Sequence, residues 1–559
     1  MESKIRKAIE TAALELGITV GNFSVEHPAE LSHGDYSTNV AMVCAKGMGK
    51  APREVAENFM KILVGKIAQV ERIEIAGPGF INFHVARDFF SEKITNVLAS
   101  GDDYGKNNSF VGQEIIFEYT SPNLFKPLHV GNLVGNIIGE SVSRLFEYGG
   151  AVVHRVNYPS DIGLTVAKGV WGLIQTNGDV TDINQIGEAY RVGNEGYEGG
   201  GMAKEEIEAI NRALYSGTDE KLNALRTQGI ATSRARFAEL CRMLGTAFDT
   251  EIFESGVSEV GTKIVREHIG DVFEESEGAI VFKGEKYGLH TRVFLNSQGL
   301  PTYEAKDLGN FALKQEKYPS WTHSFVVTGG EQREYFKVLT AALREVFPET
   351  KDKVLEHIPT GFLTLTTGKM SSRKGNVLTG ESLLEEVKEE SRVRAAESRA
   401  ENIDELTEMV AVGALKYQIL RQSLGSDIVF DKERALSLEG DSGPYLMYTH
   451  ARTVSIAEKA KEAEIVPHTE NAPSAPYEIE KLIYQFPEII LKAQRERAPH
   501  HLIVFLTELA SAFNAFYAHE KIVDTTDEYA PYKLALTLSV QTILKNGLFV
   551  LGMKAPQKM

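Results

Sequence analysis

The chain has 559 residues, of which 43% are hydrophobic and 25% charged, and its formal net charge is −17. This length and composition fit a globular protein of several domains, and the negative charge excludes a surface that is basic throughout while allowing RNA to bind at local basic patches. The two cysteines exclude a disulfide framework and a four-thiolate zinc site, and no apolar run reaches the roughly 18 residues of a membrane span, so we expect no structural metal, no DNA partner and no membrane partner.

The first residues, 1–100, are predicted to form a small α+β domain. The start, MESKIRKAIETAALELGI, has mixed charge and no apolar signal core, so we expect a cytoplasmic protein. An apolar stripe at helical spacing runs through this start: Ile5, Ile9, Ala12 and Leu16. ERIEIAGPGFINFHV alternates as a strand does and is broken by a Gly-Pro-Gly turn. The polar connector SGDDYGKNNS at 100–109 marks the domain boundary.

Residues 110–380 are predicted to form an α/β domain with a parallel sheet. EIIFEYTSPN is an apolar run that leads into a loop and a helix, and GAVVHRVNYPSDIG supplies the next strand and loop, which makes a βαβ unit. This order is interrupted at 165–285, where we expect an insertion with a glycine-rich loop, YRVGNEGYEGGGMAKEE, followed by helices. WTHSFVVTGGEQREYFKVLTAAL then adds one more strand, loop and helix.

Residues 381–559 are predicted to be helical. VAVGALKYQILRQSL, PYLMYTHARTVSIAEKAKEAE and HHLIVFLTELASAFNAFYAHEKIV each carry a broad apolar stripe, which is typical of a helical bundle. The fold class expected for the chain is therefore multidomain α/β, with an α+β domain at the N-terminus and an all-α bundle at the C-terminus.

The loop SPNLFKPLHVGN joins the first predicted strand of the α/β domain to a helix. A helix N-terminus attracts phosphate through its unpaired N–H groups, and Gly131 would let a ligand approach closely. His129 and Asn132, three apart on the first helical turn, and the cation Lys126 could face developing phosphoryl charge. The alternative is a surface loop with a capping asparagine. The residues of this region are Pro122, Asn123, Leu124, Phe125, Lys126, Pro127, Leu128, His129, Val130, Gly131 and Asn132.

A second segment, TTGKMSSRKGNVLTG at 366–380, is a basic island in an acidic chain. It has three cations, several glycines and no carboxylate, a composition suited to a triphosphate. It lacks the P-loop spacing, and the alternative is a solvated basic loop. The candidate ligand-binding residues in it are Lys369, Ser371, Ser372, Arg373 and Lys374.

Together the two segments resemble the signatures of class I aminoacyl-tRNA synthetases. HVGN is similar to the HIGH signature and KMSSR to the KMSKS signature, in the family's order and on either side of an insertion. EYTSPNLFKPLHVGN, HGDYSTNVAM, AGPGFINF, DSGPYLMYTHAR and LASAFNAFYAHEKI resemble the arginyl-tRNA synthetases over almost the whole chain. The resemblance implies a Rossmann-like catalytic domain, an additional tRNA-binding domain at the N-terminus, and a C-terminal stem and anticodon-binding domain.

The resemblance also implies an arginine site. A guanidinium offers five donors in a planar fork and is matched by carboxylates, so Asp307 is the expected guanidinium partner. Glu118 and Asn123 would hold either the guanidinium or the α-ammonium group, and we leave these two open. The arginine-binding residues implied by the resemblance are Glu118, Asn123, Tyr303, Asp307 and Gln332.

The implied reaction has two steps, formation of arginyl-adenylate from L-arginine and ATP, and transfer of the arginyl group to tRNA(Arg). Mg²⁺ would accompany ATP, and the family's usual state is a monomer. The implied catalytic residues are Lys126, His129, Asn132 and Lys369, and the implied ATP-binding residues are Gly131, Ser371, Ser372, Arg373 and Lys374.

The chain departs from the family pattern at four positions, one of which is Thr165 in place of the family's glutamine. Asn132 replaces the second signature histidine, Ser372 stands where many class I enzymes have a lysine that Lys126 would replace, and Tyr335 stands at a usual histidine. Three alternatives therefore stay open. They are a class I synthetase for another amino acid such as lysine or cysteine, another nucleotidyltransferase that shares the HIGH loop, and a catalytically impaired tRNA-binding paralogue.

Overall fold

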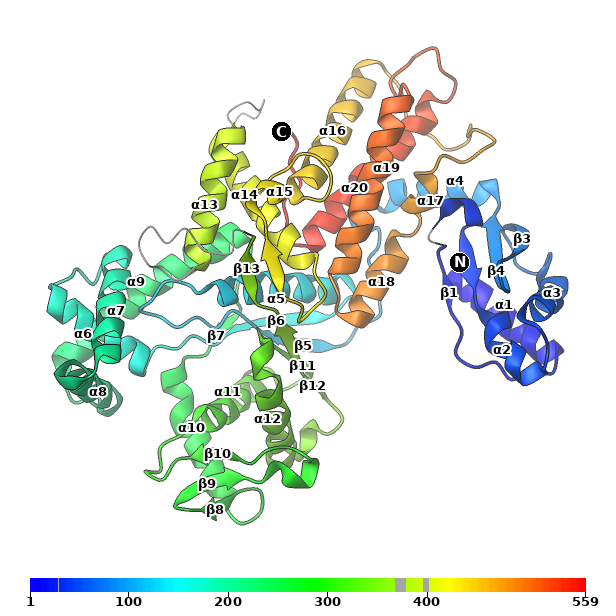
Figure 1. Cartoon of the computed structure of the whole chain (residues 1–559). Coiled ribbons are helices and arrows are strands. Elements are labelled where there is room, and N and C mark those ends of the chain that lie inside the picture. The colour runs from blue at the N-terminus through cyan, green and yellow to red at the C-terminus, as the bar shows by residue number, and fades with distance from the viewer. Residues whose placement is uncertain (29, 367–378, 396–401) are drawn as a thin grey trace. The chain divides into compact units, whose positions relative to one another are not determined.

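A computed structural model describes residues 1–28, 30–366, 379–395 and 402–559. The chain forms two compact units, each made of segments distant in sequence (Figure 1). The first unit comprises Met1–Tyr104, Arg452–Glu488 and Glu508–Leu544. The second comprises Gly105–Ala451, Ile489–Thr507 and Lys545–Met559.

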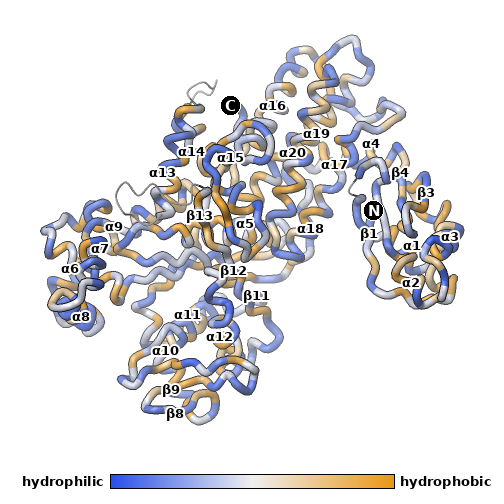
Figure 2. Tube along the Cα trace, in the orientation of Figure 1, coloured by the Kyte–Doolittle hydropathy of each residue, from blue (hydrophilic) through white to orange (hydrophobic). Residues whose placement is uncertain are grey.

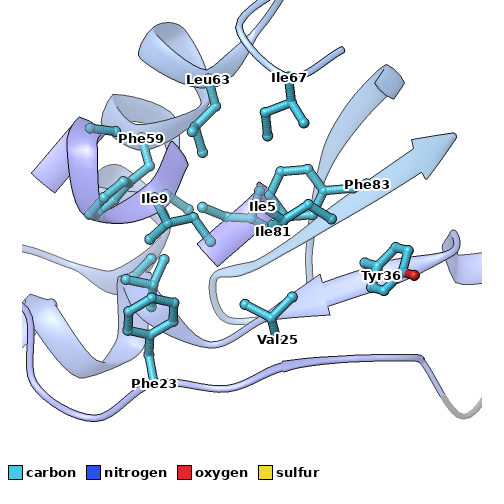
Figure 3. Packing of buried hydrophobic residues seen from close by; sticks show 14 of the residues in the cluster. Ile5, Ile9, Phe23, Val25, Tyr36, Phe59, Leu63, Ile67, Ile81 and Phe83 are labelled. Carbon is cyan, nitrogen blue, oxygen red and sulfur yellow. The ribbon is translucent and has the colours of Figure 1, made fainter. Parts of the chain in front are cut away.

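The N-terminal part of the first unit is the predicted α+β domain. Its antiparallel sheet has the order β1-β2-β4-β3, with strands Val25–Glu26, Tyr36–Thr38, Phe80–Val85 and Val70–Ala76. Its helices are α1 (Glu2–Glu15), α2 (Val40–Met48), α3 (Pro52–Leu63) and α4 (Arg87–Ser100). The predicted turn joins β3 to β4, and α1 buries the predicted stripe at Ile5, Ile9 and Ala12. Figure 3 shows Ile5 and Ile9 packed with Phe59, Ile81 and Phe83.

A five-stranded parallel sheet forms the centre of the second unit. Its order is β12-β11-β5-β6-β7, with strands Val354–Thr360, Trp321–Gly329, Glu114–Glu118, Val152–Asn157 and Thr250–Glu251. The buried strand predicted in EIIFEYTSPN is β5, and α5 (Val130–Tyr148) connects it to β6, which confirms the βαβ unit. The strand order reverses between β5 and β11, and ligands of open α/β sheets bind at the carboxyl ends of strands at such a point.

The predicted insertion begins as a group of helices (Figure 1). These are α6 (Leu164–Thr176), α7 (Ile183–Gly199), α8 (Gly201–Ser216) and α9 (Glu220–Leu244). The chain then returns to the main sheet at β7 and continues through α10 (Glu254–Glu267). A separate antiparallel sheet follows, β8 (Glu274–Ser276), β9 (Ala279–Phe282) and β10 (Arg292–Leu295), before α11 (Tyr303–Lys317) and, after β11, α12 (Arg333–Val346).

The prediction of a glycine-rich loop in YRVGNEGYEGGGMAKEE was wrong, because these residues form the end of α7 and the start of α8, with Gly200 alone between the two helices. Glycines of α6 and α7 allow these two helices to approach closely. A Cβ atom added at Gly193 would lie 2.0 Å from the carbonyl oxygen of Lys168, and one added at Gly172 would lie 1.9 Å from that of Ala189. Glycine thus has a packing role here that local sequence does not distinguish from a turn.

Replacing Gly193 by alanine is expected to destabilise the helical insertion by about 1–3 kcal/mol, because the new methyl group meets backbone that cannot move aside. The matched control is Gly199→Ala in the same helix, where the new methyl group would meet nothing within 4 Å. Thermal unfolding should show a lower midpoint for Gly193→Ala alone. Equal midpoints for the two variants would contradict the packing role.

The remaining elements confirm a mainly helical C-terminal region. Its helices are α13 (Gly380–Ala395), α14 (Ile403–Leu420), α15 (Lys432–Ala435), α16 (Gly443–Glu462), α17 (Glu480–Ile483), α18 (Phe486–Glu496), α19 (His500–His519) and α20 (Ala530–Val550). The helices carry both hydrophobic and hydrophilic residues (Figure 2). Among the described residues, only α19 has the length and hydropathy of a membrane span, and a core helix can pass the same test. A short parallel pair, β13 (Leu363–Leu365) with β14 (Ile428–Phe430), was not predicted.

Candidate active site

The loop that follows β5 is fixed to the loop that follows β6. The Leu124 amide donates to the carbonyl oxygen of Ser160, and the Ser160 amide donates to that of Pro122, both at 3.0 Å. Thr120 and Ser121 have φ values of 74° and 43°. Left-handed conformations are uncommon outside glycine and often occur at functional sites. The loop is therefore held in a defined and locally strained shape.

Phe125 anchors the same loop in the helical insertion. It is fully buried, and its own φ is 68°. A Cβ atom added at Gly169 would lie 2.7 Å from the Phe125 ring, and one added at Gly229 would lie 2.2 Å from it. The Phe125 amide donates to Ser233 Oγ at 3.2 Å. Glycines of α6 and α9 thus make room for the ring, so the insertion positions the predicted phosphate-binding loop.

His129 is the N-cap residue of α5, and its side chain is exposed. Its Nδ1 accepts a hydrogen bond from the Gly131 amide at 3.1 Å, so in the neutral ring the proton is on Nε2. Partial burial, with a smaller effect of Lys126, lowers the pKa of His129. The helix start therefore presents a neutral imidazole with an Nε2–H donor.

Asn132 faces the loop backbone. Its Nδ2 donates to the carbonyl oxygens of Thr120 at 2.6 Å and Ser121 at 3.4 Å. In this arrangement its amide group supports the strained turn, whereas the sequence suggested a donor to phosphate.

Lys126 is partly buried, and its Nζ lies 5.9 Å from the centre of the Tyr190 ring. Burial, with a smaller effect of Lys168, lowers the pKa of Lys126. The cation thus lies on the side of the loop that faces α7.

The predicted residues of the basic segment lie outside the described residues: Lys369, Ser371, Ser372, Arg373 and Lys374. Where the chain resumes, Thr379 forms a backbone bridge with His129. The Gly380 amide donates to the carbonyl oxygen of Leu128 at 2.7 Å, and the Leu128 amide donates to Glu381 Oε1 at 3.0 Å. The C-terminal end of the basic segment is therefore joined to the start of α5.

A second group of polar side chains lies between the sheet and α11. Glu118 ends β5 and is 5% exposed. Its Oε2 accepts from Lys314 Nζ at 2.5 Å and from Asn310 Nδ2 at 2.9 Å. Asp307 accepts a short hydrogen bond from the Tyr335 hydroxyl of α12. Glu118 and Asp307 thus line one cavity, together with Asn310 and Lys314.

The environment of Asp307 favours its neutral form. Burial raises the pKa of Asp307 to about 7, and the Glu118 carboxylate acts in the same direction. The Tyr335 hydrogen bond and the Lys314 ammonium group act in the opposite direction. A cationic ligand placed here would restore the ionised carboxylate, because an adjacent positive charge favours it.

The other predicted arginine-binding residues lie in the surrounding loops and helix ends. Tyr303 begins α11 and is 74% exposed, with Lys306 Nζ 5.5 Å from the centre of its ring. Gln332 is exposed in the turn between β11 and α12. Asn123 forms a backbone bridge with Ser160. The structure therefore brings Glu118 and Asp307 together in a cavity and leaves Tyr303 and Gln332 exposed.

Sequence reasoning missed Asn310 and Lys314 as members of the site. Both follow Asp307 on α11, at positions i+3 and i+7, which places them on one helical face. A lysine and an asparagine in the otherwise apolar stretch DLGNFALK were the available signal. Tyr335 had been recognised only as a departure from the family pattern.

Family comparisons cover nearly the whole chain. The model described as "tRNA synthetases class I (R), catalytic domain" matches residues 93–432. The "Arginyl tRNA synthetase N terminal domain" matches residues 1–85, and the "DALR anticodon binding domain" matches residues 446–559.

Individual proteins match over similar lengths. The arginine--tRNA ligase of Limosilactobacillus reuteri (strain DSM 20016) is 31% identical over 576 residues, and the match covers 100% of both chains. The arginine--tRNA ligase of Halothermothrix orenii is 29% identical, and the match covers 96% of this chain and 95% of the relative. The Thermus thermophilus arginyl-tRNA synthetase structure matches with a TM-score of 0.81 and 25% identity over both full chains. The methionyl-tRNA synthetase of Mycobacterium tuberculosis, at 12% identity over 78% of this chain and 91% of its own, shares the fold with a TM-score of 0.52.

Proposed function

Because the chain belongs to the arginyl-tRNA synthetase family of class I enzymes, we propose that it activates L-arginine with ATP and transfers the arginyl group to the 3′ end of tRNA(Arg). The observation that carries this function is the cavity that both Glu118 of β5 and Asp307 of α11 line. The family and its named relatives do not favour a synthetase for another amino acid, another nucleotidyltransferase or an inactive paralogue.

In the first step an oxygen of the arginine carboxylate attacks the α-phosphate of ATP. A phosphorus–oxygen bond forms, the bond to the β-phosphate breaks, and pyrophosphate leaves. Preorganised donors are most effective where negative charge develops, and His129 Nε2–H and the Lys126 ammonium group are suited to this role. Asn132 would maintain the shape of the loop that presents them.

The basic segment would close on the phosphates from the other side, with Mg²⁺ brought by ATP. The junction of Thr379 and Gly380 with the start of α5 supports this role. The residues proposed to contact the phosphates are Lys369, Ser371, Ser372, Arg373 and Lys374. In the second step the 3′-terminal ribose oxygen of the tRNA attacks the arginyl carbonyl, and AMP leaves.

Selectivity for arginine would come from buried acceptors that a smaller or uncharged side chain leaves unpaired. Sites that depend on a substrate's own hydrogen-bonding groups can reject analogues by roughly 10⁴–10⁵-fold. Asp307 would pair with the guanidinium group. Glu118 and Asn123 would hold the guanidinium or the α-ammonium group, and Tyr303 and Gln332 would complete the arginine site.

Three regions of the chain would have separate roles in binding and charging tRNA. Residues 1–100 would act as the additional tRNA-binding domain, 110–380 as the catalytic domain with its insertion at 165–285, and 381–559 as the stem and anticodon-binding domain. The matched N-terminal and anticodon-binding family models support this division. The enzyme is proposed to act as a monomer in the cytoplasm.

Arginine binding is expected to weaken as the pH falls below about 7. The pKa of Asp307 is raised to about 7 in the arginine-free site, so the carboxylate is neutral at lower pH and cannot pair with the guanidinium group. Well below this pKa the KM for arginine should rise about tenfold per pH unit, and above it the KM should level off. Aminoacylation measured from about pH 5.5 to 8.5 at saturating ATP and tRNA checks this, and a flat profile would exclude titration of the binding carboxylate.

Aminoacylation of purified tRNA tests the proposed function directly. The protein should attach labelled arginine to tRNA(Arg) and leave tRNA for lysine uncharged. Attachment of lysine in place of arginine would refute the assigned specificity. Failure of the folded protein to charge tRNA with any amino acid would refute the activity.

A further inference from the structure

Asn310 occupies a position in the cavity that the arginine site, as described so far, does not explain. It lies three residues after Asp307 on α11 and is 2% exposed. Its amide group meets Glu118 Oε2 at 2.9 Å. Because a carboxylate only accepts hydrogen bonds, the amide nitrogen must be the atom that faces Glu118, and this fixes the other atom, Oδ1, as the one that faces away.

Asn310 Oδ1 is an acceptor without a donor. It is buried, and within the described ranges no donor lies within hydrogen-bond distance of it. Leaving a buried polar group unpaired costs about 1–3 kcal/mol, so such an atom calls for a donor that a ligand or water can supply. Asn310 lines the same cavity as Glu118 and Asp307, and the cavity has a volume of about 40 Å³. That is room for roughly three water molecules, or for a planar group of one carbon and three nitrogen atoms.

The charges around the cavity leave one carboxylate without a cation. Lys314 pairs with Glu118 at 2.5 Å, and Arg497 pairs with Glu356, a further lining residue, at 2.9 Å. His357 also lines the cavity, and burial lowers its pKa to about 4, so its ring is neutral near pH 7. Among the residues that the structure describes, the hydrogen-bond partner of Asp307 is the neutral Tyr335 hydroxyl. One uncompensated carboxylate and one neutral acceptor match a singly charged group with several N–H donors.

We propose that Asn310 is an arginine-recognition residue whose Oδ1 accepts a hydrogen bond from a terminal nitrogen of the substrate guanidinium group. This inference rests on the proposed function. In this arrangement the Asn310 amide nitrogen donates to Glu118, and its oxygen accepts from the substrate. The Asp307 carboxylate forms the ion pair with the guanidinium group. Lys314 neutralises Glu118, so that the cavity presents a net charge matched to one guanidinium group.

The test compares Asn310→Ala with the wild-type enzyme on two substrates, L-arginine and ω-N-monomethyl-L-arginine, by ATP–pyrophosphate exchange in the presence of tRNA. A hydrogen bond to a charged group contributes about 1.5–3 kcal/mol, so kcat/KM for arginine should fall about 10–100-fold. The methylated substrate lacks one N–H donor, so its kcat/KM should fall much less in Asn310→Ala. The ratio of kcat/KM for arginine to kcat/KM for the methylated substrate should therefore shrink about tenfold. Glu316→Ala, on the exposed face of α11, should leave the preference unchanged.

If Asn310 had only a structural role, Asn310→Ala would lower kcat/KM for both substrates by the same factor, and that result overturns the proposal. Equal use of both substrates by the wild-type enzyme also overturns it. The preference is a ratio measured within one protein, so a partly inactive preparation does not affect it. Should Asn310→Ala fail to fold, Asn310→Leu, which fills the space without an acceptor, is measured in the same way with the same two outcomes. Absence of any arginine-dependent exchange in the wild-type protein refutes the proposed function itself.

Discussion

Replacing Asp307 by alanine is expected to lower kcat/KM for arginine by about 10⁴-fold or more. Among the described carboxylates that line the cavity, Asp307 has a neutral hydrogen-bond partner, whereas Glu118 and Glu356 pair with Lys314 and Arg497. Without it the guanidinium group would enter the cavity with no compensating charge, and a buried unpaired charge is strongly destabilising. Arginine-dependent ATP–pyrophosphate exchange measures the effect.

Two further variants separate charge from shape at this position. Asp307→Asn keeps the size of the side chain and removes its charge, so it should retain the fold and still lose most of the activity. Glu316→Ala removes an exposed carboxylate from the same helix and should behave as wild type. Near-normal arginine use by Asp307→Ala would contradict the assignment of the guanidinium site.

Replacing His129 by alanine is expected to lower kcat about 10²–10³-fold, with little change in the KM for arginine. His129 caps α5 by accepting from the Gly131 amide, and we propose that its Nε2–H also donates to the phosphates. Loss of a donor aimed at transition-state charge has an effect of this size in other enzymes. Single-turnover formation of arginyl-adenylate measures it without the later steps.

The variant His129→Asn distinguishes the two functions. Asparagine is a good N-cap residue but does not extend as far as the imidazole Nε2–H. We expect it to be nearly as slow as His129→Ala, while His290→Ala, an exposed histidine of the same unit, retains wild-type turnover. Full turnover in His129→Asn would reduce His129 to a capping residue.

The elements that the sequence predicted well are those in which local pattern and tertiary packing agree. The apolar run before SPNLFKPLHVGN could only be buried as a strand, and its prolines and glycine mark the loop that precedes α5. The helix α7 was missed because its glycines serve tertiary packing and do not mark a turn. Gly193, for example, packs closely against the Lys168 carbonyl group. The three-residue strands β13 and β14 are too short to show a period.

The site was predictable only in part, for a similar reason. Spacing placed His129 and Asn132 on the first turn of α5, but it could not show that Asn132 donates to the Thr120 carbonyl oxygen. Family resemblance singled out Asp307 and Glu118, which are distant in sequence and meet in one cavity. It did not indicate Asn310, because a donor to Glu118 and an unpaired acceptor become visible only when side-chain positions are known.

We propose that this chain activates arginine and that Asp307 and Glu118 make the site selective for it. The most direct measurement is ATP–pyrophosphate exchange with each standard amino acid in turn, with and without total tRNA. We expect exchange with arginine alone, and only when tRNA is present. Exchange with a different amino acid would contradict the specificity while leaving the fold intact, and no exchange with any amino acid in the folded protein would contradict the activity.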